Sequence, residues 1–147
     1  MRQFISFTIG DEEYGVDIMA IREIKGWTAT TELPNTPAYM RGVINLRGAI
    51  VPILDLRSRF GSGATDASAR HVIIVVAVGS RVAGILVDAV ADILAVSGED
   101  IQPVPNLDQN AAAGFLTGLV TVDGRMVALL DLDRVFAFDL ADENVAA

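Results

Sequence analysis

Short apolar runs, rich in β-branched residues and separated by glycine turns, recur along the whole chain. FISFTIG and VIIVVAV have the composition of strands, and each is followed by a hairpin turn, GDEE or GSR. GVDIMAIREI predicts a short helical turn that runs into another strand. Two further hairpins, VINL-RG-AIVPILDL and LVTV-DG-RMVALLDL, turn at 47–48 and 123–124. The pattern predicts an all-β chain with short helices, built as small barrels that leave no open sheet edge.

The chain repeats one unit twice. Residues 42–60 and 118–136 share their glycines, a Leu-Asp-Leu motif and a final phenylalanine, and residues 10–24 match 79–93 in the same order. We infer one domain over 1–138, with subdomains at about 10–60 and 70–138 and a first strand able to pair across them. Residues 61–70 predict a connecting loop, and 139–147 predict a flexible C-terminal tail.

An aspartate follows the second hairpin strand in each unit. Asp55 and Asp131 both precede a leucine and a short amphipathic stretch, which predicts two helix N-caps. Two carboxylates from two similar β units also suggest an aspartic-protease-like hydrolase. Those enzymes have Thr/Ser-Gly after the aspartate, whereas leucine stands there in this chain, so capping is the favoured interpretation.

Composition excludes several classes of function. The 147 residues are 52% hydrophobic and 20% charged, with a net charge of −8, which disfavours nucleic acid and anionic membrane surfaces as partners. The longest purely apolar run, 72–78, is far shorter than the roughly 18–20 residues of a spanning helix. The first residues show no signal-peptide pattern, and the absence of cysteine fits the cytoplasm.

Motifs for chemistry are absent from the sequence. It contains no zinc, nucleotide or serine-nucleophile motif, and its one histidine, His71, is interpreted as structural. We therefore predict no catalytic residue, no metal, no cofactor and no small-molecule substrate. A binding surface remains, with Arg47 at a hairpin tip and Glu23 in the other repeated block as candidates. Gly48 alone can supply a positive φ to the turn, so Arg47 is either a solvated charge or a functional one.

Four stretches together resemble one protein family. YGVDIMAIREI, LPNTPAYMRGVINLRGAIVPILDLR, GILVDAVADIL and FLTGLVTVDGRMVALLDL are similar, in sequence and order, to the CheW family of chemotaxis coupling proteins. The resemblance covers residues 3 to about 138. It implies two SH3-like, five-stranded β-barrel subdomains, in agreement with the duplication, and a non-enzymatic adaptor without a cofactor.

The same resemblance implies partners and sites. The partners are the cytoplasmic tip of methyl-accepting chemotaxis receptors and the regulatory domain of the histidine kinase CheA, so the adaptor is cytoplasmic and recruited to membrane-associated receptor arrays. Gln102 departs from the basic residue that many relatives carry near the second kinase contact. The implied residues are Glu23 and Arg47 for coupling, Ile21 and Val87 for the receptor groove, and Gly42, Val43 and Leu107 for further partner contacts.

Three alternatives stay open at this point. The chain could be a detached regulatory domain of a CheA-type kinase, or a CheW-like adaptor of a non-flagellar chemosensory pathway. The two-aspartate hydrolase is the most remote of the three.

Overall fold

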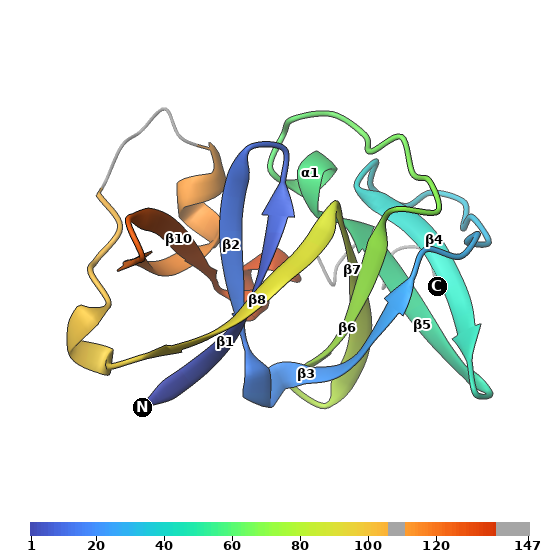
Figure 1. The fold of residues 1–147 in the computed structure, drawn as a ribbon. Helices are drawn as coiled ribbons and strands as arrows, with labels where there is room; N and C mark the ends of the chain where they lie inside the picture. Colours follow the sequence, from blue (N-terminus) through green and yellow to red (C-terminus); the bar gives the residue numbers. More distant parts are fainter. Residues whose placement is uncertain (106–110, 138–147) are drawn as a thin grey trace.

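The computed structural model describes residues 1–105 and 111–137, whose strands form two five-stranded sheets lying side by side (Figure 1). The first sheet has the order β3 (Ile21–Gly26), β6 (Val72–Val78), β7 (Arg81–Val87), β5 (Ala49–Asp55) and β4 (Met40–Leu46). The second has the order β8 (Ala89–Val96), β1 (Arg2–Ile9), β2 (Glu12–Asp17), β10 (Arg125–Leu130) and β9 (Leu116–Val122). The short helices are α1 (Leu56–Arg59), α2 (Leu132–Val135), η1 (Ile18–Ala20), η2 (Gly98–Asp100) and η3 (Ala111–Phe115).

An equivalent pair of backbone hydrogen bonds closes each sheet into a barrel. Thr31, beyond the end of β3, exchanges two hydrogen bonds of 2.9 Å with Val43 of β4. Gln102, beyond the end of β8, exchanges two of 2.8 Å with Leu119 of β9. These bridges join the two edges of each sheet, so the predicted SH3-like barrels are confirmed. We call the sheet of β3–β7 the first barrel and the other sheet the second barrel.

The barrels do not follow the subdomain boundaries expected from the repeat, about 10–60 and 70–138. β1 and β2 pair with β8 and β10 of the second unit, whereas β6 and β7 pair with β3 and β5 of the first. The two units have thus exchanged their first hairpins, and not only the first strand. The physical reason is that duplicated hairpins present equivalent edges and apolar faces, so each unit can complete the barrel of the other.

Apolar side chains fill the two barrels and the space between them. Six residues form the interior of the first barrel: Ile44, Val51, Ile53, Ile73, Val75 and Leu86. A larger core combines residues of both barrels, among them Phe7, Tyr14, Leu54, Val76, Val87, Leu130 and Phe136. Because this shared core draws on both sheets, it holds the barrels together as one unit.

The two aspartates cap helices, as predicted. The Asp55 carboxylate accepts a 3.4 Å hydrogen bond from the Ser58 amide, and Asp131 accepts one of 3.2 Å from the Arg134 amide. Asp55 is also buried, and it accepts 2.7 Å bonds from both the amide and the hydroxyl of Thr65. Its oxygens are engaged in structure, which argues against a role as a hydrolytic carboxylate.

Candidate functional site

The turn between β4 and β5 places an arginine in an unfavourable backbone conformation. Arg47 has φ = 50° and Gly48 has φ = 88°, so both central residues of the turn are left-handed. The side chain of Asn45 accepts a 2.8 Å hydrogen bond from the Gly48 amide and supports the turn. The sequence interpretation gave the positive φ to Gly48 alone. A non-glycine residue such as Arg47 costs about 1–2 kcal/mol in this region, and asparagine or aspartate tolerates it better.

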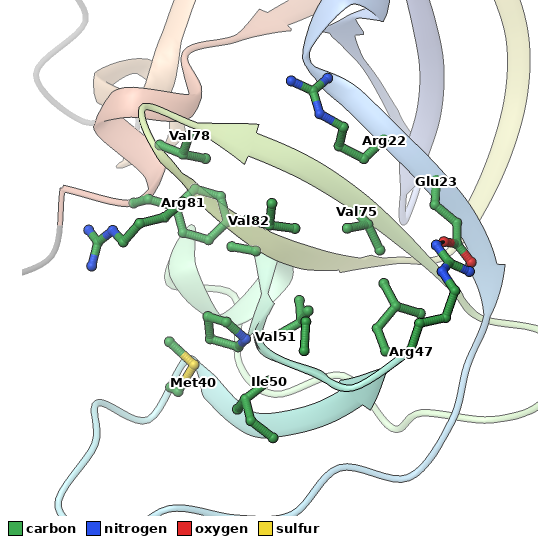
Figure 2. A pocket seen from close by; sticks show the side chains of 15 residues that line it. Arg22, Glu23, Met40, Arg47, Ile50, Val51, Val75, Val78, Arg81 and Val82 are labelled. Atoms are coloured by element: carbon green, nitrogen blue, oxygen red, sulfur yellow. Dashed lines mark hydrogen bonds and ion pairs between the residues drawn. The ribbon is translucent and has the colours of Figure 1, made fainter.

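Arg47 and Glu23 meet at the end of the first barrel. The Arg47 guanidinium donates a hydrogen bond to Glu23, which reaches it from β3, and Figure 2 shows the two side chains converging. The Arg47 side chain is 74% exposed and that of Glu23 is 25% exposed. The structure thus brings together the two residues singled out from the sequence, as an accessible, charge-assisted pair.

The ion pair borders an apolar groove of about 650 Å³ on the first barrel (Figure 2). Strands β3 to β7 all contribute to it. Ile50 and Val82 line this groove with 65% and 40% of their surfaces exposed, which is unusual for large apolar residues in strands. Its remaining apolar lining is Met40, Leu46, Ala49, Val51, Pro52, Val75, Val78, Ala83 and Phe136.

Sequence reasoning missed this apolar surface. The signal for Ile50 lies in AIVPILDL, where the side chains of β5 alternate between the barrel interior and its exterior. Val51 is buried at 2% exposure, so its neighbour Ile50 must face outward. An apolar outward residue beside Arg47 could have indicated a contact surface.

Gly42 and Val43 have a structural role at the barrel seam. Gly42 has φ = 134°, and a Cβ placed there would lie 2.2 Å from the backbone oxygen of Thr31. Val43 is half-buried and makes the two closing hydrogen bonds to Thr31. Barrel closure therefore explains why glycine stands at position 42, and no contact with a binding partner is needed to account for it.

The two residues predicted to line a receptor groove differ in accessibility. Ile21 is half-buried at the start of β3 and packs against the shared core. Val87 is 1% exposed and packs within that core, and its place in a receptor groove wall stays a prediction. β7 is an interior strand of its sheet, and Val87 at its end packs in the core that the two barrels share.

The second predicted kinase contact is only partly described. Leu107 lies outside the described residues. Gln102 is exposed, and its backbone closes the second barrel through Leu119. Its place in the fold therefore depends on its backbone, while its side chain is available to solvent.

Two further polar residues, His71 and Tyr14, have partners within the fold. His71, whose side chain is 12% exposed, accepts a 3.0 Å hydrogen bond from the Ser68 amide at Nδ1 and lies 3.5 Å from Asp88 through Nε2. Burial, followed by the hydrogen bond and the charge of Glu12, raises the pKa of the Tyr14 phenol.

Across residues 1–105 and 111–137 no group of three or more His, Cys, Asp or Glu side chains could hold a metal ion. In the same ranges, none of the helices has the length and apolarity to cross a bilayer.

Two closed barrels that present an apolar groove and an exposed ion pair define a protein-binding module. A family model described as "CheW-like domain" matches residues 3–139. This chain belongs to the CheW-like family.

Individual relatives agree with this assignment. The chain is 53% identical over 135 residues to "Chemotaxis protein CheW" of Rhizobium meliloti (strain 1021), with 92% of this chain and 87% of that protein covered. It is 42% identical over 136 residues to the protein of the same name in Klebsiella aerogenes, covering 92% and 82%. The crystal structure of the scaffolding protein TtCheW from Thermoanaerobacter tengcongensis matches with a TM-score of 0.86 at 32% identity, over 94% of each chain. These similarities support a non-enzymatic chemotaxis adaptor.

Proposed function

We propose that this chain couples methyl-accepting chemotaxis receptors to the histidine kinase CheA, and that the Glu23–Arg47 pair beside the groove is part of the coupling surface. The adaptor is cytoplasmic and is recruited to receptor arrays at the membrane. Ile21 belongs to the receptor contact in this proposal, Val43 to a partner contact along β4, and Leu107 to a second kinase contact.

The observation that carries the proposal is the conformation of Arg47. An exposed ion pair contributes about 0.2–1 kcal/mol to stability, and a left-handed arginine costs about 1–2 kcal/mol. Folding therefore gains nothing from arginine at this position. Strained backbone that stability does not explain occurs preferentially at binding sites. A guanidinium held by a rigid hairpin also contacts a partner at low entropic cost.

Calorimetric titration tests the proposal. The purified chain is titrated with the CheA regulatory domain and, separately, with a receptor cytoplasmic fragment. Arg47→Asn is compared with Arg2→Gln, which removes another exposed ion pair, Arg2–Asp17, at 3.3 Å in the second barrel. We expect binding to both partners, weakened at least tenfold by Arg47→Asn and little changed by Arg2→Gln. Absence of binding to either partner would reject the coupling function, and equal affinities of the two variants would remove Arg47 from the interface.

A further inference from the structure

The groove on the first barrel carries a positive rim in an acidic protein. The charged residues among its described lining are three arginines, Arg22, Arg47 and Arg81, and one carboxylate, Glu23. The whole chain has a net charge of −8. An apolar floor with a cationic rim suits a segment that combines apolar side chains with carboxylates.

The last ten residues of this sequence have that composition. Residues 138–147 read Phe-Asp-Leu-Ala-Asp-Glu-Asn-Val-Ala-Ala, with three carboxylates, three large apolar side chains and no lysine or arginine. The described part of the chain reaches the groove just before this segment. Phe136, at the C-terminal end of α2, is itself a lining residue, and only Ala137 separates it from the segment.

We propose that residues 138–147 dock in the groove of their own chain and compete there with a partner. Extended, ten residues reach about 33 Å, which exceeds the roughly 23 Å length of a seven-residue strand such as β6. The tether gives the segment an effective concentration in the millimolar range, so a weak intrinsic affinity is enough to populate the docked state. A carboxylate of the segment then competes with Glu23 for Arg47, which connects the groove to the coupling pair.

Paramagnetic relaxation in the full-length chain tests the docking. The chain has no cysteine, so Ala146→Cys gives a single site for a nitroxide label. We expect the amide signals of Ile50 and Val82 to lose at least half the intensity that they have in the same sample after the nitroxide is reduced. Leu94 and Val96 in the core of the second barrel serve as references and are expected to keep theirs. Equal intensities at groove and reference amides would overturn the proposal.

Charge-neutralised variants test the electrostatic part. The variant Asp139→Asn/Asp142→Asn/Glu143→Gln is expected to restore the groove signals, as is 0.5 M salt, because Arg–carboxylate attraction at an exposed rim is screened. A control that removes three exposed acids elsewhere, Asp11→Asn/Glu99→Gln/Asp100→Asn, is expected to leave the broadening unchanged. Broadening that survives the first variant would reject charge complementarity as the cause of docking.

A mixed sample distinguishes docking within one chain from docking onto a second copy of the chain. Isotope-labelled chain without nitroxide is combined with unlabelled, nitroxide-bearing chain, and we expect no broadening. Broadening in the mixture would assign the groove to another molecule and overturn docking within one chain. No partner enters these experiments, so their outcome is independent of the proposed function. Competition rests on that function: the acid-neutralised variant is expected to bind the partner at least threefold more tightly, and unchanged affinity would reject competition.

Discussion

Replacement of Arg47 by asparagine separates the backbone of the turn from the ionic contact of the side chain. Arg47 and Gly48 have φ values of 50° and 88°, and the equivalent turn of the second barrel has 52° and 80° at Asp123 and Gly124. The second turn thus adopts the same conformation with a residue that favours it. Arg47→Asn is therefore expected to keep the turn and remove only the pair with Glu23.

The magnitude follows from two opposing terms. The left-handed arginine costs about 1–2 kcal/mol, and asparagine, which tolerates this region better, recovers about 1 kcal/mol of it. Loss of the ion pair costs about 0.2–1 kcal/mol, because the Arg47 side chain is 74% exposed and well solvated. We expect Arg47→Asn to lie within about 1 kcal/mol of the wild type, on the stabilised side. Arg47→Ala loses the pair and keeps the strain, so it is expected to be about 1 kcal/mol less stable than the asparagine variant.

Urea unfolding followed by fluorescence measures both variants. Trp27, the only tryptophan of the chain, packs against the core of the first barrel and reports on its unfolding. If the same variants are unfolded by heat, a difference of 1 kcal/mol in unfolding free energy corresponds to about 2–4 °C in Tm for a chain of this size. An asparagine variant destabilised by more than about 2 kcal/mol would refute the reasoning, because Arg47 would then be structural. So would an alanine variant at least as stable as the asparagine one.

Three further predictions concern residues with structural explanations. Gly42→Ala is expected to destabilise by more than about 3 kcal/mol, because its Cβ would lie 2.2 Å from a backbone oxygen. Gly98→Ala, which meets open space, is expected to change stability by less than about 1 kcal/mol, and equal urea midpoints of the two variants would contradict the closure argument. Asp55→Ala is expected to destabilise by about 3 kcal/mol, because it leaves buried donors unpaired. Asp131→Ala is expected to destabilise by about 1 kcal/mol, because it removes a helix cap. The reverse order of the two Tm values in thermal unfolding would reject these assignments. Val87→Ala is expected to cost about 2 kcal/mol with unchanged partner affinity in calorimetry, and weaker binding at unchanged stability would favour its predicted groove role over a purely structural one.

The elements that depend on neighbouring residues could be predicted from the sequence. The Asp123-Gly124 hairpin and the aspartate caps are set within a few residues, and the structure contains them where expected. The exchange of hairpins could not be predicted. It depends on pairings such as β1 with β8 and β3 with β6, and equivalent strands of a duplicated unit satisfy either arrangement equally well.

The candidate coupling pair was predictable because one of its residues had no structural explanation. Arg47 stood out because a turn does not require arginine, and the structure pairs it with Glu23. GILVD is apolar at successive positions, so the sequence does not show whether Val87 faces the core or the outside. Ile50 was missed because apolar residues in a strand are ordinarily assigned to the core, whereas this one is 65% exposed.

The duplication produces two faces that are not interchangeable. Exchange of the hairpins builds the groove from β3, β4 and β5 of one unit and β6 and β7 of the other, so neither unit alone contains it. On the second barrel, the positions equivalent to Glu23 and Arg47 are the acidic Asp92 and Asp123. The cation there, Arg125, is held by Glu13 at 2.9 Å, a hydrogen bond that raises its pKa. A carboxylate that binds at Arg47 would be repelled at the equivalent turn of the second barrel, because an aspartate stands there. The two barrels have equivalent strand orders and differ in charge at this turn, so a carboxylate ligand that pairs with Arg47 would discriminate between them.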